Sequence, residues 1–510
     1  LEKNIGINNK IININMKKLN QKIIVLCLIV FVIVGCKTKY ELSAPKKKPN
    51  ILFLLTDDQS FSTINTLGNN EVYTPNMDKL VANGITFTHA HIMGSNSGAV
   101  CLPSRAMLMT GSFVQNLAKV PAAIDINDKT MPEVLKTAGY TTFGTGKWHN
   151  GRQAFARSFT NGANIFMGGM SNHLKVPLYN FDETGEYPRN KTYYEDKFSS
   201  VIFREAAVDF LKNYEKENPF FAYVAFTSPH DPRMAPEAYQ KKYNTSNISL
   251  PKNFLPKHPF DNGELIIRDE NLLPFPRTEE AVKEEIAAYY AMISEVDDNI
   301  GKILKALDES GHADNTIIIF AADNGLAAGQ HGLLGKQNLY DHSVRVPLVI
   351  SGPGIKKGER TESLVYLNDI FPTVADMVGV KKPETIDGLS LLPILKDSKA
   401  TIRESVYFLY KNFQRGVRTK DWKLIKYLVD GKKTTQLFNI KKDPLEINNL
   451  ASDPKYKDKV EEMTSLLQEW MNKSGDNVQL NEPDWGVKVI KSWVTMRKEK
   501  GLPLDSKGIH

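Results

Sequence analysis

Long apolar runs alternate with amphipathic segments over most of the chain. Four runs are apolar almost throughout and are bounded by polar or turn-forming residues: 50–56, 220–226, 316–322 and 346–351. Such runs are typical of strands that are buried on both faces, as in parallel sheets covered by helices. Three intervening stretches have helical spacing: 131–138, 203–217 and 279–310. We therefore predict an α/β fold with a large, mostly parallel central sheet flanked by helices.

The pattern changes near residue 400. Four short strand-like segments follow, separated by polar turns such as Asp430-Gly431: 405–410, 416–419, 422–427 and 436–439. A helical pattern at 457–473 carries an apolar stripe that we assign to core packing. We predict a large domain at 49–400 and a smaller α+β subdomain with an antiparallel sheet at 401–510.

Basic residues gather at the N-terminus. Residues 1–35 contain five Lys and one Glu, and residues 37–48 contain the same numbers of each. Because the whole chain carries a net charge of +7, residues 49–510 together carry −1. This nearly neutral part gives no argument for nucleic-acid binding.

The first part of the chain resembles an export signal. A basic segment from Met16 to Lys22 precedes thirteen mostly apolar residues at 23–35, too few to span a bilayer. Gly35-Cys36 at its end resembles the bacterial lipobox, whose Cys becomes the lipid-bearing first residue of the mature protein. The alternative is an ordinary signal peptide with an incidental Cys.

We therefore expect residues 1–35 to be a leader, with a mis-called start before Met16, and residues 36–48 to be a tether. The mature protein would be anchored through lipid on Cys36 in a bacterial cell envelope, at the outer membrane or facing the periplasm.

Cys101 is the only Cys expected in the mature domain. Of the three Cys in the chain, Cys27 lies in the expected leader and Cys36 would carry lipid. No disulfide could then form within the mature chain. A single thiol in an exported protein is liable to oxidation unless it is buried or has a chemical use.

The segment around Cys101 carries the most specific motif. Cys101-Leu-Pro103-Ser-Arg105 is followed by Thr110-Gly111. Pro103 can be the first residue of a helix, which would place Arg105 in a first turn that favours an anion. The full spacing resembles the signature of the formylglycine-dependent sulfatases of the alkaline phosphatase-like superfamily. The alternative is a buried structural Cys ahead of a helix.

The resemblance implies that a sulfatase-maturing enzyme converts Cys101 to 3-oxoalanine (formylglycine), whose hydrate attacks sulfur. A thiol would leave a stable adduct, whereas a geminal diol can expel sulfate with its second hydroxyl. Further blocks extend the resemblance over about residues 49–454. The segment 335–347 is closest to the branch that includes iduronate-sulfatase-like and choline-sulfatase-like enzymes.

Two polar clusters each follow a predicted buried strand. Asp57-Asp58 follows the first strand, and Asp323-Asn324 follows another. Adjacent carboxylates repel one another unless a cation bridges them, and ligands gather at the carboxyl edge of open α/β sheets. Either cluster alone is typical of a turn. Together they form an oxygen-rich set that favours Ca²⁺, with Mg²⁺ second. The resemblance implies the same four ligands, and we include Cys101 in the metal site.

Four basic side chains complete the predicted site. Lys147 and His149 lie in Gly-Lys-Trp-His-Asn-Gly, His230 in Ser-Pro-His-Asp-Pro, and Lys336 in Gly-Lys. The resemblance implies that Lys147 and Lys336 hold the sulfate oxygens and that His149 contacts the hydrated aldehyde. His230 would hold or protonate the leaving oxygen beside Lys336, and the choice of proton donor stays open. Any one of these residues alone would be read as solvated or as part of the core.

These observations predict a sulfuric ester hydrolase that acts on a sulfated polysaccharide or oligosaccharide, such as ulvan or a glycosaminoglycan. One alternative is a phosphoester or phosphonate monoester hydrolase of the same superfamily. Another is a non-catalytic, glycan-binding lipoprotein, which would not need the nucleophile and all the metal ligands together.

The polar segments 152–197 and 233–277 lie outside the motifs, and we expect them to shape the substrate pocket. In them Asn172, His173 and Arg233 are candidates for contact with sugar, with solvated loop side chains as the alternative.

Overall fold

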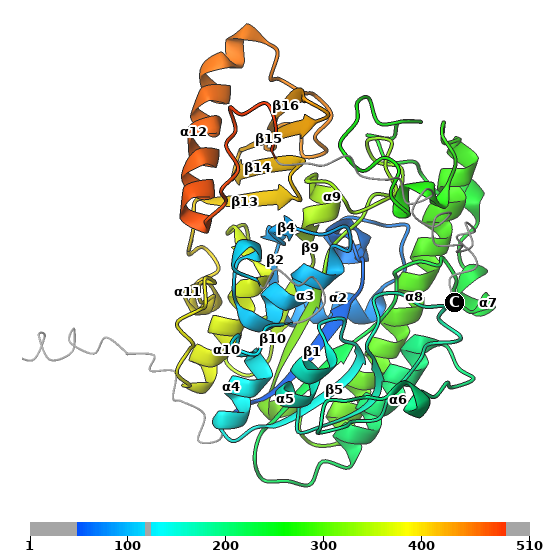
Figure 1. Cartoon of the computed structure of the whole chain (residues 1–510). Helices are drawn as coiled ribbons and strands as arrows, with labels where there is room; N and C mark the ends of the chain where they lie inside the picture. Colours follow the sequence, from blue (N-terminus) through cyan, green and yellow to red (C-terminus); the bar gives the residue numbers. More distant parts are fainter. Residues whose placement is uncertain (1–47, 118–123, 486–510) are drawn as a thin grey trace, which may run out of the picture. The chain divides into compact units, whose positions relative to one another are not determined.

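The computed structural model describes residues 48–117 and 124–485 (Figure 1). The expected leader and nearly all of the expected tether lie outside the described residues, so both stay predictions. Within the described ranges, no helix combines the length and apolarity needed to cross a membrane.

An eight-stranded sheet is the centre of the fold. Its strands, in spatial order, are β11 (Glu359–Thr361), β2 (Gly84–Phe87), β10 (Leu348–Ser351), β8 (Thr316–Ala322), β1 (Asn50–Thr56), β7 (Phe220–Ala225), β5 (Thr141–Lys147) and β6 (Asn161–Phe166). The run from β8 to β6 is parallel. Strand β10 is antiparallel to both of its neighbours. The predicted mostly parallel sheet is therefore confirmed.

Alternate side chains of the central strands enter different cores. Leu52 and Leu54 of β1 pack with α2 (Pro75–Asn83), α6 (Ser199–Lys212) and α8 (Glu279–Glu309). Ile51, Phe53 and Leu55 belong to the larger core with four other helices: α3 (Cys101–Thr110), α4 (Met131–Thr137), α5 (Arg152–Ser158) and α10 (Ile370–Val378). Helices thus cover both faces, which explains why the strands are continuous apolar runs.

The C-terminal sheet is mainly antiparallel, as predicted, and α12 (Lys457–Ser474) packs against it (Figure 1). Its strands in spatial order are β16 (Lys432–Asn439), β15 (Trp422–Val429), β14 (Gln414–Thr419), β13 (Ser405–Tyr410) and β4 (Gly94–Ser95). Strand β4 lies just ahead of Cys101 in sequence and pairs in parallel with β13. The boundary expected at residue 400 stays a prediction.

The remaining elements are short. A three-stranded sheet has the order β12 (Val365–Tyr366), β3 (Ala90–His91) and β9 (Arg345–Val346). The short α-helices among the described residues include α7 (Glu237–Gln240), α9 (Asp341–Val344) and α11 (Leu392–Lys396).

Three local expectations differ from the structure. The run 346–351 was expected to be one strand, but β9 ends at Val346 and β10 begins at Leu348 in another sheet. Helix α3 begins at Cys101 rather than Pro103, because Ser104 N already donates to Val100 O at 3.2 Å. Pro103 is tolerated there, since N–H groups of a first turn have few intrahelical acceptors. The apolar pattern also missed β5, whose sequence Thr-Thr-Phe-Gly-Thr-Gly-Lys is rich in Gly.

Candidate active site

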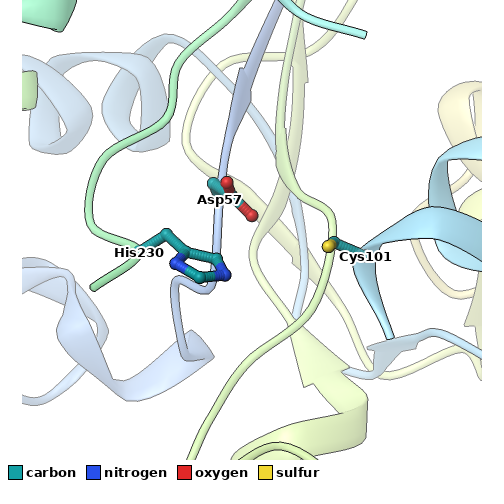
Figure 2. A group of neighbouring side chains, drawn as sticks. All are labelled: Asp57, Cys101 and His230. Carbon is teal, nitrogen blue, oxygen red and sulfur yellow. The ribbon is translucent and has the colours of Figure 1, made fainter. Parts of the chain in front are cut away.

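The predicted site residues come together at the carboxyl edge of the central sheet. In register, Thr56 of β1 pairs with Ala322 of β8, so Asp57-Asp58 and Asp323-Asn324 leave the sheet side by side. Lys147 is the last residue of β5, and His230 lies in the loop after β7. Figure 2 shows the side chains of Asp57, His230 and Cys101 converging from three separate segments.

Three carboxylates form the acidic part of the site. Ligand oxygens of Asp57, Asp58 and Asp323 lie within 4.8 Å of one another, and all three side chains are buried. Asn324 donates from Nδ2 to Asp58 Oδ1 at 2.7 Å. Within the described residues, Asp57 Oδ1 and Asn324 Oδ1 accept no hydrogen bond. Buried oxygens without donors, beside converging carboxylates, fit a hard divalent cation.

Two lysine ammonium groups lie against these acids. Lys147 Nζ is 2.5 Å from Asp57 Oδ2, and Lys336 Nζ is 2.6 and 2.8 Å from the two oxygens of Asp58.

Arg105 Nε is 2.7 Å from Asp323 Oδ2, and its Nη1 donates to Lys147 O at 2.7 Å. A bound anion would therefore meet two ammonium groups, while the guanidinium holds Asp323 and the end of β5 in place.

The free-energy cost of ionisation differs between the buried carboxyl groups of Asp57 and Asp58. Burial, and then the charge of Asp323, raise the pKa of Asp57 well above its ordinary value, despite Lys147. Burial opposes ionisation of Asp58 too, but His230 and Lys336 hold its pKa below the ordinary value. The ionised form of Asp57 thus lacks compensation that a bound cation would supply.

Cys101 lies at the start of α3 with its thiol against two basic side chains. Sγ is 3.4 Å from His149 Nδ1 and 3.4 Å from Lys147 Nζ. Burial raises the pKa of the thiol even though Lys147 acts in the opposite direction. Burial, followed by the charge of Lys147, holds the pKa of His149 well below its ordinary value. An unmodified thiol here is therefore a poor nucleophile.

His230 is held by its own loop. Nδ1 is 2.8 Å from Asp231 O, and Nε2 is 3.6 Å from Asp58 Oδ2. Burial lowers the pKa of His230 to about 4, so the ring is neutral near pH 7. With its Nδ1 proton donated to Asp231 O, Nε2 is the free ring nitrogen.

Sequence reasoning missed the residues that fix this loop. Arg268 contacts both carboxylate oxygens of Asp231, with Nη2 at 3.0 Å from Oδ1, and it also contacts Asp269. Arg268 stands 38 positions after His230 in a polar segment without a motif, so the only available signal was that Asp231 follows His230.

Two site residues have backbone conformations that are unusual outside Gly. The φ angles of Asp58 and His149 are 63° and 66°. Such left-handed conformations cost free energy and are concentrated at functional sites, where surrounding contacts hold them. Each residue lies two positions after the last residue of a strand.

The three candidates for sugar contact have different surroundings. His173 is buried, with Nε2 at 2.9 Å from His230 O and Nδ1 at 2.9 Å from Ser199 Oγ, so it supports the loop. Arg233 lies over the Tyr289 ring, and Asn172 lines a cavity.

The comparisons with known proteins agree with one another. Residues 49–380 match the family described as Sulfatase, and residues 329–473 match N-sulphoglucosamine sulphohydrolase, C-terminal. The chain is 29% identical over 504 residues to the N-acetylglucosamine-6-O-sulfatase of Bacteroides thetaiotaomicron, covering 84% of this chain and 88% of that protein. It is 29% identical over 480 residues to an ulvan-active sulfatase of Formosa agariphila, covering 88% and 86%.

Among solved structures, a protein in complex with its substrate D-glucosamine-2-N,6-O-disulfate is similar, with a TM-score of 0.74 and 26% identity. The similarity covers 84% of this chain and 99% of that chain.

Proposed function

Since the chain belongs to the sulfatase family, we propose that it removes sulfate from a saccharide at the site around Cys101. One observation carries this proposal. Cys101 lies within 3.4 Å of both His149 and Lys147, and Lys147 in turn lies 2.5 Å from a cluster of three buried carboxylates. A nucleophile, anion-binding ammonium groups and a cation site are thus adjacent.

The proposed nucleophile is formylglycine made from Cys101 by a sulfatase-maturing enzyme. The raised pKa of the thiol disfavours attack by sulfur itself, which supports a modified side chain. One hydroxyl of the hydrated aldehyde would attack sulfur and displace the saccharide alcohol. Loss of the proton from the other hydroxyl would then expel sulfate and re-form the aldehyde. His149, the ring nearest to Sγ, is the group placed to exchange that proton.

Asp57, Asp58, Asp323 and Asn324 would hold a divalent cation, for which we propose Ca²⁺ because every side-chain ligand is an oxygen. When bound, the cation would orient the sulfate group and offset its negative charge. Within the described residues, Asp57 Oδ1 and Asn324 Oδ1 accept no hydrogen bond, which supports this assignment. Cys101 lies beside the four ligands, and its replacement aldehyde would share the site.

The remaining side chains act on the ester. Lys147 and Lys336 would hold its non-bridging oxygens, because both ammonium groups are buried and point at the acidic cluster. His230 and Lys336 both approach Asp58, so either can reach a leaving oxygen bound there. Since the ring of His230 is neutral at pH 7, Lys336 is the group that carries a proton to donate.

The proposed substrates are sulfated saccharides. The similar proteins include an N-acetylglucosamine-6-O-sulfatase and an ulvan-active sulfatase, and the similar solved structure holds a disulfated glucosamine. These names support a glycosaminoglycan fragment or an algal polysaccharide.

We also propose export and anchoring through lipid on Cys36, supported by the basic, apolar and Gly-Cys pattern of residues 16–36. Labelling with a radioactive fatty acid in a bacterial host tests the anchor. Incorporation that is lost in Cys36→Ala supports it, and equal incorporation in both proteins rejects it.

The hydrolysis test uses protein made together with a maturing enzyme. It should release sulfate from 4-nitrophenyl sulfate and from N-acetylglucosamine 6-sulfate, and the rates on the matching phosphate and phosphonate esters should be at least tenfold lower. Faster cleavage of a phosphonate monoester than of any sulfate ester would reject the proposed function. The same reaction with Cys101→Ala measures the background.

A further inference from the structure

A cavity of about 650 Å³ lies next to the active site, between the start of α5 and the loop after β6. Phe166, one of its lining residues, pairs in register with Lys147 on the neighbouring strand. Gly168 and Met170 line it too, and Gly169 between them lies so close to His149 that a Cβ there would come within 2.5 Å of the ring. The cavity therefore shares a wall with residues that contact Cys101.

The charged residues lining this cavity are all basic. Arg152 and Lys175 are its titratable cations, and no Asp or Glu is among the described residues that line it. Arg152 lies 5.7 Å from the centre of the Tyr179 ring and donates to Glu186 O at 3.3 Å. These contacts leave the guanidinium at the cavity wall without neutralising it.

The rest of the lining fits a sugar. Asn172 and Ser171 offer hydrogen-bonding groups, and Tyr194 presents a ring that is 63% exposed. Exposed aromatic rings combine an apolar face with a polar tip, and pockets for small ligands pair such faces with a few placed polar groups. The lining therefore suits a saccharide ring that bears a negative charge.

A second cavity, of about 480 Å³, shows that this charge pattern is not general. Its lining includes the acids Glu71, Asp341 and Glu446 together with Lys252 and Arg345. Bases and acids are mixed there, whereas the cavity beside His149 has bases alone among its described charged residues.

We propose that the cavity beside His149 binds a second anionic group of the saccharide that carries the scissile sulfate ester, with Arg152 and Lys175 as its counter-charges. The group is a carboxylate of a uronic acid or a further sulfate, since a guanidinium recognises both. This inference rests on the proposed function and adds a substrate class to it: acidic saccharides with at least two negative groups.

Binding is measured by calorimetry with the unmatured protein, which keeps the Cys101 thiol, in the presence of Ca²⁺. Two matched pairs of probes are compared. D-glucosamine-2-N,6-O-disulfate is paired with N-acetylglucosamine 6-sulfate, and glucuronate 2-sulfate is paired with glucose 2-sulfate. The first pair tests a second sulfate and the second pair tests a carboxylate.

In at least one pair, the doubly charged sugar should bind about tenfold or more tightly than its partner. The double variant Arg152→Met/Lys175→Met should reduce that ratio to about one, while Lys252→Met, a change in the second cavity, should preserve it. Ratios near one in both pairs for the wild type, or a ratio that survives the double variant, would overturn the proposal.

A separate assay distinguishes this failure from failure of the proposed function. Hydrolysis of 4-nitrophenyl sulfate, which has no second anion, is measured with the matured wild type. Absence of hydrolysis in the matured wild type would reject the proposed function, whereas the binding ratios do not depend on turnover.

Discussion

Two buried clusters of acids and bases in the described part of the chain are built differently. At the sheet edge, Asp57, Asp58 and Asp323 face one another. Below the C-terminal sheet, by contrast, Asp341 of α9 lies between Arg418 of β14 and Lys423 of β15. In the first cluster three carboxylates converge on one point, whereas in the second Lys423 separates Asp341 from Glu446.

One acid from each cluster illustrates the difference. Burial opposes ionisation of Asp341, but Arg418 and Lys423 bring its pKa well below the ordinary value. In the first cluster the pKa of Asp57 is raised, because burial and Asp323 outweigh Lys147. The ionised form of Asp341 is thus stabilised by its protein partners, whereas that of Asp57 would be stabilised by a bound cation.

The largest expected effect is a loss of turnover without a loss of stability. Cys101→Ala should lower turnover of 4-nitrophenyl sulfate by at least about a thousandfold, because the nucleophile is lost. Its melting temperature should stay close to that of the wild type, since the change removes one small buried atom and leaves both ionic clusters intact. Turnover within tenfold of the wild type would place the nucleophile elsewhere.

The opposite result, a loss of stability without a loss of turnover, is expected for a change in the second cluster. Lys423 Nζ is 2.8 Å from Asp341 Oδ1 and 2.7 Å from Glu446 Oε1. Lys423→Met should lower the free energy of unfolding by about 3–5 kcal/mol, because the buried Glu446 loses its basic partner and Asp341 keeps only Arg418. Turnover per folded molecule should be retained.

Urea unfolding measures the stability change, and Lys426→Met, on the same strand at a half-buried position, is the matched control. Equal stability of the two variants would show that the second cluster contributes little to the fold.

Metal removal should act on the first cluster alone. Treatment with a chelator should lower turnover by about a hundredfold or more, and Ca²⁺ should restore it. Ca²⁺ should also raise the melting temperature of the wild type, because it binds the folded state preferentially. Asp323→Asn should abolish that rise. A rise of equal size in the variant would mean that the ion binds elsewhere.

The smallest effect is a dependence of stability on pH. Burial raises the pKa of Glu446 to about 7, against an ordinary value of 4.5, despite the charge of Lys423. Because the folded pKa is the higher one, this contribution to stability is present below about pH 4.5 and is lost as pH rises to about 7.

Glu446→Gln removes that titration. The difference in unfolding free energy between the variant and the wild type should therefore shift in favour of the variant between pH 4.5 and 7. Parallel stability curves for the two proteins would contradict the assigned role of Glu446.

The same contrast explains what could be predicted from sequence. The sheet-edge residues follow buried strands, and the pairing of β1 with β8 brings Asp57 beside Asp323, as strand ends in a parallel sheet require. The second cluster joins Asp341, Arg418 and Lys423 over more than 80 positions, and no local pattern specifies such distant pairings.

Strand β5 shows another limit of the apolar pattern. A Cβ at Gly146 would lie 1.9 Å from Ala225 O, and one at Gly144 would lie 2.8 Å from the Phe155 ring. Close packing requires Gly at both positions, so the strand that carries Lys147 lacks the apolar residues by which strands are recognised. The motif located Lys147, but the periodicity did not locate its strand.

The cavity beside His149 also could not be predicted from the sequence. Its bases come from Arg152 at the start of α5 and Lys175 in a later loop. The polar segment 152–197 could be assigned to the substrate pocket only in general terms, because the conformation of a loop depends on contacts that its own composition does not encode.

The most direct test of the central claim is the mass of the peptide that contains Cys101. The protein is made with and without a sulfatase-maturing enzyme and is then digested. We expect the mass of an aldehyde in place of the thiol only in the first sample, together with sulfatase activity. An unmodified Cys101, in cells that convert a known sulfatase, combined with undiminished hydrolysis of sulfate esters, would contradict the account.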